Sequence, residues 1–230
     1  DDWSDATSLP SDFGGFYGNY YDSESDRCIL LQSTSDNTIP WSYDFNNDEW
    51  EETRLDINPD AKPDILGSML DMSEVSDNSF DAIYSSHNIE HVYPHEIRTA
   101  FSEMFRVLKD DGFLFITCPD LQAVCEEVAK GNLLKPLYNL PNGEGIAAID
   151  IIYGHRPSLK AGNYFMAHKS GFVSSDLMNE LKSVGFTSIS AVKSKEAYQL
   201  WCLAYKKLFK THIDLNKEIL LHFDKNINVS

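Results

Sequence analysis

The chain has 230 residues, of which 42% are hydrophobic and 12% aromatic, so it can bury one sizeable core and is not a disordered protein. Its 36 acidic and 19 basic residues give a net charge of −17, which would repel a phosphate backbone, and we expect no nucleic-acid partner. No apolar run approaches the roughly 18 residues of a membrane span, so we expect no membrane partner either. The acidic N-terminus lacks the pattern of a signal peptide, which predicts a cytoplasmic location.

Pattern changes along the chain predict one α/β domain with additions. Residues 1–27 carry many aromatic residues without a helical or strand period, and we interpret them as an irregular N-terminal arm. Residues 28–210 form the predicted domain, interrupted at 121–170 by a loop-rich insertion with many Gly and Pro residues. Residues 211–230 are predicted to form an amphipathic C-terminal helix.

Short apolar runs that stop at polar or turn-forming residues predict the first strands of a mostly parallel sheet. The first run, Cys28–Leu31, has the character of a buried parallel strand, and the next two are Thr53–Ile57 and Asp64–Leu66. The fourth, Phe80–Ser86, leads into a helix whose apolar residues from Ile97 onward keep a 3.6-residue period. Gly112 is placed to end that helix.

The second half continues the alternation of strand and helix that indicates right-handed crossovers. A buried fifth strand is predicted at Phe113–Cys118. After the insertion, a helix is expected at Ser174–Val184, capped by Ser174 or Ser175 and ended by Gly185. Ser188–Val192 and Tyr198–Tyr205 then read as an antiparallel hairpin that closes the sheet. The predicted fold is therefore Rossmann-like, with an antiparallel C-terminal strand.

Polar residues at strand ends are the candidates for a ligand site, because open parallel sheets bind ligands at the carboxyl ends of their strands. Asp56 ends the second strand, where a carboxylate can accept hydrogen bonds from two vicinal ribose hydroxyls or serve as an ordinary turn residue. A polar cluster, from Ser85 to Val92, follows the fourth strand.

Three histidines, His87, His91 and His95, recur every fourth residue, a spacing that places zinc ligands on one face of a continuous helix. Pro94 interrupts this segment, and Asn88 stands where the glutamate of a metalloprotease would follow the first histidine. We therefore predict no metal ligands, with a zinc hydrolase as the reading that these histidines would support.

Two motifs make the resemblance specific. Phe80–Val92 contains Ile89-Glu90-His91-Val92, and Arg106–Gly112 reads Arg-Val-Leu-Lys-Asp-Asp-Gly. The chain resembles the class I S-adenosylmethionine-dependent methyltransferases of the type 11 branch, where a phrase ending in LEHV follows strand four and RVLKPGG precedes strand five. The resemblance runs from about Cys28 to Asp120 and more loosely to Tyr205.

The resemblance implies S-adenosylmethionine as cofactor and a methyl transfer in line from sulfur to a small-molecule acceptor. By the same resemblance Asp56, with Ile57 beside it, would hold the ribose, Ser68 and Met69 would flank the adenine, and Ser86 and His87 would lie near the sulfonium. Gln32 and Ser33, which begin the loop after strand one, would also bind the cofactor. Because that loop lacks the glycines of the family, the alternative reading is a non-catalytic binding or scaffold protein of the same fold.

The insertion is expected to cover the reactive end of the cofactor and to form the acceptor pocket. Its candidate pocket residues are Tyr153, His155, Arg156, Tyr164, Phe165 and His168. If the acceptor needs a general base, His91, His155 or His168 would supply it, since imidazole titrates near neutral pH. Arg156 could clamp an acceptor anion or tie its own loop to the protein.

Overall fold

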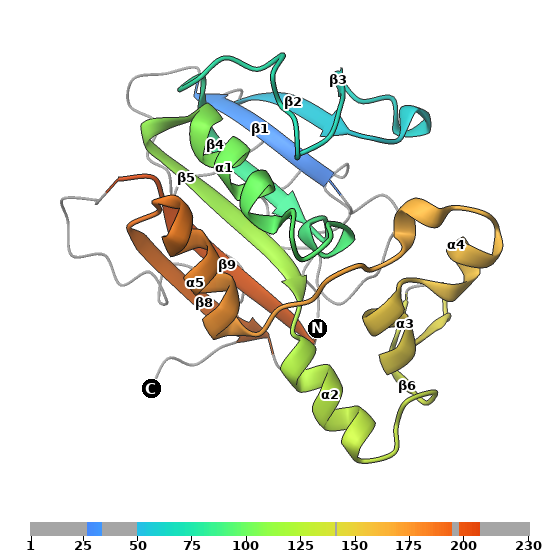
Figure 1. Ribbon diagram of the computed structural model, residues 1–230. Helices are drawn as coiled ribbons and strands as arrows, with labels where there is room; N and C mark the ends of the chain where they lie inside the picture. Colours follow the sequence, from blue (N-terminus) through green and yellow to red (C-terminus); the bar gives the residue numbers. More distant parts are fainter. Residues whose placement is uncertain (1–26, 34–49, 141, 195–197, 208–230) are drawn as a thin grey trace.

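The computed structural model of the chain describes residues 27–33, 50–140, 142–194 and 198–207. Seven strands of this part form one sheet in the order β3-β2-β1-β4-β5-β9-β8 (Figure 1). These strands are β1 (Arg27–Ser33), β2 (Trp50–Asp56), β3 (Ile65–Leu66), β4 (Phe80–Ser86), β5 (Leu108–Pro119), β8 (Ser188–Ser194) and β9 (Gln199–Tyr205). Apart from Arg27, the predicted arm at 1–27 lies outside the described residues, as does the predicted helix at 211–230.

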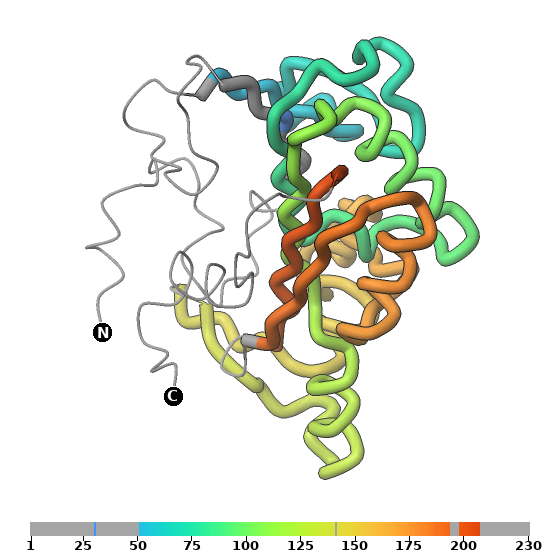
Figure 2. Tube along the Cα trace, turned by 90° about the vertical axis from the view of Figure 1, so that its left-hand side faces the viewer, coloured from blue at the N-terminus to red at the C-terminus, as the bar shows by residue number. Residues whose placement is uncertain are grey.

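Two helices, α1 (Ile97–Val107) and α5 (Ser174–Val184), pack side by side on one face of the sheet (Figures 1 and 2). Helix α1 forms because its apolar residues recur at helical spacing and are all buried against the strands: Ile97, Ala100, Phe101, Met104 and Val107. The main core joins these side chains to apolar residues of β4, β5, α5 and β9. No helix of the described chain is long and apolar enough to cross a membrane.

Strand directions confirm the predicted α/β fold. Strands β2, β3, β4, β5 and β8 point one way, and β9 runs antiparallel to both β5 and β8. The predicted bounds of β4 and α5 agree with the structure at both ends. Helix α5 ends at Gly185, with a φ of 127°, but its N-cap is Val173 and not Ser174 or Ser175.

The direction of β1 corrects the sequence analysis. We expected a parallel strand, but β1 pairs antiparallel with both of its neighbours, β2 and β4. Parallel neighbours need a crossover connection, usually a helix, whereas antiparallel strands do not. The connection from β1 to β2 contains Pro40 and has no helical period, so its sequence does not favour such a crossover helix.

The end of α1 also differs from the prediction. The helix stops at Val107, and Leu108 already pairs with Phe80 of β4. Gly112 lies buried within β5, where a Cβ atom would come within 2.9 Å of the Asp81 carbonyl oxygen. The glycine is therefore needed for a close approach between strands and not for a helix cap.

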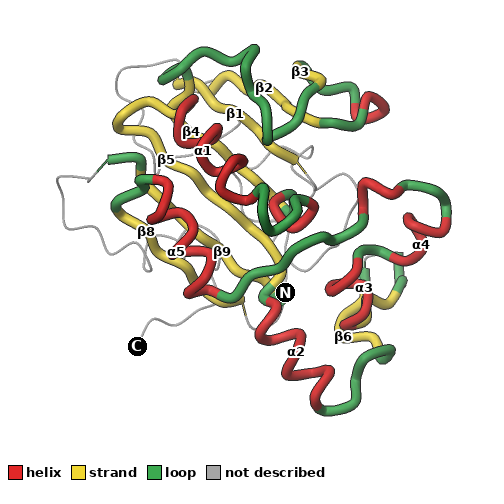
Figure 3. The backbone as a smooth tube through the Cα atoms, in the orientation of Figure 1, coloured by secondary structure: helices red, strands yellow, loops and turns green. Residues whose placement is uncertain are grey.

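The insertion between Leu121 and Ser170 contains short elements with a small core of their own (Figure 3). They are α2 (Leu121–Ala129), β6 (Pro136–Asn139), β7 (Gly145–Ala147), α3 (Ala148–Tyr153), α4 (Arg156–Lys160) and the 3-10 turn η4 (Tyr164–Met166). Two further 3-10 turns, η2 (Pro59–Ala61) and η3 (Ile89–His91), follow β2 and β4. The Gly and Pro residues of the insertion limit the length of these elements but do not prevent them from forming. Pro157 lies in the first turn of α4, and Gly154 ends α3.

Asp150 holds the insertion together. Its buried carboxylate accepts hydrogen bonds from the Arg156 guanidinium at 2.5 and 2.9 Å and from the Ala147 backbone N–H at 2.9 Å. Burial raises the pKa of Asp150, but the Arg156 pair and the backbone N–H groups lower it by more, so the pKa lies below its ordinary 3.8. Of the two readings considered for Arg156, this contact supports the structural one.

Arg106, the first residue of the second motif, ties α1 to the segment before β4. Its guanidinium donates to both carboxylate oxygens of Glu103, at 2.9 and 2.8 Å, and to Asp77 at 2.6 Å. It also donates to the backbone carbonyls of Met72 and Val75, each at 2.8 Å. Arg106 therefore fixes the loop between β3 and β4 against α1.

We predict that Arg106→Ala lowers the free energy of unfolding by about 2 kcal/mol, because two carbonyls and two carboxylates lose a charged donor. Urea denaturation followed by circular dichroism measures this change. The control is Arg98→Ala, which removes a guanidinium that is 69% exposed and pairs only at the surface with Glu180. Equal shifts in the two variants would contradict the structural role of Arg106.

We predict that Asp150→Asn removes a pH-dependent part of the stability. Since the pKa of Asp150 is lowered on folding, its contribution is fully present above the ordinary pKa of 3.8 and is lost as pH falls through the lower folded value. The difference in unfolding free energy between wild type and variant should therefore shrink at acid pH. Urea denaturation over a pH series measures it, and a difference that stays constant would refute the argument.

Candidate functional site

The carboxyl ends of β2 and β4 lie at the same end of the sheet, with β1 between them, on the side that faces the insertion (Figure 1). Leu55 of β2 and Ser85 of β4 share the same register partner in β1, Cys28. The next residues, Asp56 and Ser86, therefore lie at the same level on either side of β1. This agrees with the expectation that the strand-end residues gather at one edge.

On the β2 side the site combines one carboxylate with exposed apolar side chains. Asp56 is partly buried, and its Oδ1 accepts a hydrogen bond from the Asn58 backbone N–H at 2.7 Å. Ile57, which follows β2, and Leu66, which ends β3, are 54% and 60% exposed. Such exposed apolar side chains beside a carboxylate are suited to contact a flat ring and a hydroxylated sugar.

The residues after β3 lie next to this side. Ser68 and Met69 are partly buried, and the register Asp56↔Leu66 places the end of β3 beside the end of β2. The Ser68 hydroxyl accepts a hydrogen bond from the Leu70 backbone N–H at 3.1 Å, which shapes the turn. The structure thus brings Asp56, Ile57, Ser68 and Met69 to one end of the sheet.

On the β4 side the chain turns sharply into buried polar residues. Ser86 accepts a hydrogen bond from the Thr117 hydroxyl at 3.0 Å, and His87 adopts a φ of 44°, which a non-glycine residue seldom takes. The Ser85 Oγ and Asn88 Oδ1 atoms are buried without a hydrogen-bond partner among the described residues. Unsatisfied polar atoms of this kind indicate a place where a ligand binds.

Gln32 and Ser33 do not join this site. Because β1 is antiparallel, they pair with Glu51 and Trp50 at the start of β2, at the opposite edge of the sheet from Asp56 and Ser86. The predicted cofactor role of Gln32 and Ser33 therefore conflicts with the direction of β1. The site edge next to β1 is formed instead by the start of that strand.

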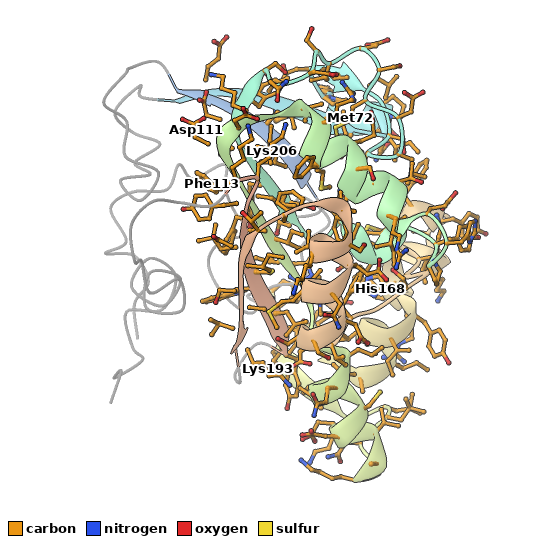
Figure 4. The ribbon with its side chains drawn as sticks, turned by 60° about the vertical axis from the view of Figure 1, so that its left-hand side comes forward. Met72, Asp111, Phe113, His168, Lys193 and Lys206 are labelled. Atoms are coloured by element: carbon orange, nitrogen blue, oxygen red, sulfur yellow. The ribbon has the colours of Figure 1, made fainter. Side chains whose placement is uncertain are left out.

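Beyond Ser86, a buried carboxylate meets three histidines. Glu90 has no exposed surface, and its Oε1 lies 3.2 Å from the Nδ1 of His87. Ligand atoms of Glu90, His91 and His168 all lie within 4.8 Å of one another, and we call these three residues the Glu90 cluster. His168 comes from the insertion and lies at the far end of the sheet from Asp111 and Lys206 (Figure 4).

The charges in this cluster shift its pKa values. Burial raises the pKa of Glu90, but the hydrogen bond and charge of His87, with smaller effects of His168 and His91, bring it down to about 2. Burial lowers the pKa of His168 to about 4, against an opposing effect of Glu90. At neutral pH the cluster therefore contains an ionised carboxylate and a neutral His168.

Backbone groups fix how the insertion meets the cluster. The Glu90 carbonyl accepts hydrogen bonds from the backbone N–H groups of Lys169 at 2.8 Å and Ser170 at 3.0 Å. From the sequence, His91 and His168 are predicted separately as bases, and Glu90 has no predicted role. The motif Ile-Glu-His-Val marks Glu90, yet no spacing rule connects it to a histidine in a distant insertion.

His155 lies in a different environment. Its two ring nitrogens contact Ser158 Oγ at 2.8 Å and Glu144 Oε1 at 3.2 Å. With Arg156 and Lys160 it lines a cavity of about 350 Å³ within the insertion. His95 is also separate, since it is exposed and stacks on Tyr93. The structure therefore brings together two of the three predicted bases, His91 and His168.

The aromatic residues predicted for the acceptor pocket are on the surface of the insertion. Tyr153, Tyr164 and Phe165 are 64%, 75% and 51% exposed. They remain candidates for contact with an acceptor.

The segment that contains these strand ends is similar to a known family of protein domains. Residues 42–116 match the model of a family described as methyltransferase domain. None of the curated proteins compared with the chain matches it.

Several solved structures resemble the chain at low sequence identity. A protein from Pyrococcus horikoshii is 18% identical with a TM-score of 0.44, and the likeness covers 66% of this chain and 70% of that one. A SAM-dependent methyltransferase from Methanosarcina mazei is 16% identical, with a TM-score of 0.41 and coverage of 66% and 80%. One from Thermotoga maritima, titled a possible histamine N-methyltransferase, is 16% identical with a TM-score of 0.37. The likeness covers 61% of this chain and 62% of that protein, less than two thirds of its length.

The family match runs through β2, β3, β4, α1 and most of β5, and so includes Asp56, Ser86 and both motifs noted in the sequence. Through this segment the chain is similar to the methyltransferase domain of that family, in agreement with the resemblance that the two sequence motifs indicate.

Proposed function

We propose that the chain transfers a methyl group from S-adenosylmethionine to a small-molecule acceptor at the edge formed by the ends of β2, β4 and β5. The observation that carries this proposal is the common level of Asp56 and Ser86 across β1, within the segment that matches the methyltransferase domain. The Asp56 carboxylate and the polar turn after Ser86 therefore lie near each other at one end of the sheet. A cofactor with a ribose and a methionine part could contact both.

The residues on the β2 and β4 sides fit the cofactor. The Asp56 carboxylate would accept the two ribose hydroxyls, and the exposed Ile57, with Ser68 and Met69 after β3, would border the adenine. Ser86, His87 and the unsatisfied oxygen of Asn88 would meet the methionine end. At this end of the sheet β1 contributes its start, Arg27, and not the loop that follows the strand, so β4 would supply those contacts.

For this reaction the main task of the protein is to position the acceptor relative to the methyl donor. When bound, the sulfonium of the cofactor supplies an activated methyl group with an excellent leaving group, so holding the acceptor in line provides most of the rate. His168 is a poor general base at neutral pH, because its pKa is lowered to about 4. A small acceptor is supported by the 350 Å³ cavity of the insertion, a volume typical of small-ligand sites.

We predict that the chain binds S-adenosylhomocysteine and that Asp56→Asn weakens this binding at least about tenfold, since an amide oxygen replaces a charged acceptor of two hydroxyls. Asparagine can still accept the Asn58 backbone hydrogen bond that Asp56 accepts, so the turn should survive. Isothermal titration calorimetry measures both affinities.

The matched control is Asp60→Asn, which removes an exposed acid from the turn η2 after the same strand. Its affinity should equal that of the wild type. Absence of binding at millimolar S-adenosylhomocysteine would overturn the proposal, and equal losses in the two variants would overturn the role of Asp56.

A further inference from the structure

Three hydrogen-bond acceptors converge in the Glu90 cluster. The Nδ1 of His91 lies 3.1 Å from the Ala167 carbonyl oxygen, and the Nδ1 of His168 lies 2.7 Å from that of Ile151. A carbonyl oxygen only accepts, so each Nδ1 carries the proton of its ring and each neutral ring keeps a lone pair on Nε2. Both rings therefore present an acceptor to a cluster that already contains a carboxylate.

The Glu90 carboxylate gives a second, independent observation. One oxygen, Oε1, contacts His87, but the buried Oε2 has no hydrogen-bond partner among the described residues. A buried carboxylate oxygen without a partner is costly, and native proteins seldom leave one unless a ligand, water or ion compensates it. Three acceptors facing one another call for a cation between them.

We propose that Glu90, His91 and His168 bind one divalent transition-metal ion, for which Zn²⁺ is the best match. Two imidazole nitrogens and one carboxylate oxygen form the ligand set of open zinc sites, which keep a further position for water or a substrate atom. The ligand atoms lie within 4.8 Å of one another, so small side-chain rotations bring each to the roughly 2.0–2.2 Å of a zinc bond.

The surroundings of the three ligands support a metal. Ligating histidines usually donate their second ring N–H to a carbonyl or carboxylate, as His91 and His168 do toward Ala167 and Ile151. His87 orients the other oxygen of Glu90 in the same way.

The competing account is a proton in place of the metal, held on one imidazole as an ion pair with Glu90. This account needs no ion and predicts no specific metal affinity. The two accounts therefore differ in a direct measurement, which is independent of S-adenosylmethionine binding and of methyl transfer.

The test uses the full chain with any polyhistidine tag removed, stripped with a chelator and dialysed. Calorimetric titration with Zn²⁺ should show one ion per chain, and Co²⁺ in its place should give visible absorption bands from bound metal. Glu90→Gln and His168→Ala should each weaken Zn²⁺ binding by more than the roughly 10- to 100-fold that loss of an outer partner causes. His95→Ala, which removes an exposed histidine outside the cluster, should leave the affinity unchanged.

Thermal unfolding of the metal-free proteins separates loss of ligands from loss of folding. Zn²⁺ should raise the melting temperature of the wild type and of His95→Ala, but not that of Glu90→Gln, which keeps the shape of the side chain. Absence of saturable Zn²⁺ and Co²⁺ binding by the folded wild type would overturn the proposal in favour of the proton. Wild-type affinity in His168→Ala would overturn it as well.

Discussion

The buried Glu90 carboxylate is the constraint on which the site end of the molecule depends, because an ionised group with no exposed surface must be compensated by its neighbours. Its partners come from two distant parts of the chain, the turn after β4 and the end of the insertion. The backbone carbonyl of the same residue also accepts two hydrogen bonds from that end. One residue therefore joins the insertion to the sheet through both its charge and its main chain.

The cofactor edge and the Glu90 cluster are built by the same strand. β4 runs between β1 and β5 and is buried along most of its length, and Ser86, His87 and Glu90 follow within five residues at its carboxyl end. A rigid strand of this kind positions side chains more accurately than a loop does. The positive φ of His87 is the cost of turning the chain so soon after the strand.

Local sequence patterns predicted the elements whose apolar residues follow a regular strand or helix period. They failed where contacts between residues distant in sequence determine the structure. The bounds of β4 and α5 follow from apolar runs and helical spacing, and the edge shared by Asp56 and Ser86 follows from sheet topology. The direction of β1 depends on its neighbours β2 and β4, and an apolar run of four residues has no polarity of its own. The sequence predicts Gly112 as a helix cap, and only the structure shows that the Asp81 backbone packs against it. The meeting of Glu90 with His168 was equally hidden, because it depends on how the insertion folds back.

The two ends of the insertion meet. Asp120 and Phe172 form a parallel bridge, and the Leu121 backbone N–H donates to the Phe172 carbonyl at 3.0 Å. The segment is therefore a loop whose two ends are held together next to the sheet. Lengthening or shortening such a loop changes the entropy of closing it only slightly. The whole module, with the acceptor pocket proposed for it, could therefore be exchanged without a change to the strands of the sheet. Only a replacement that returns a histidine beside Glu90 would keep the buried charge compensated in the same way.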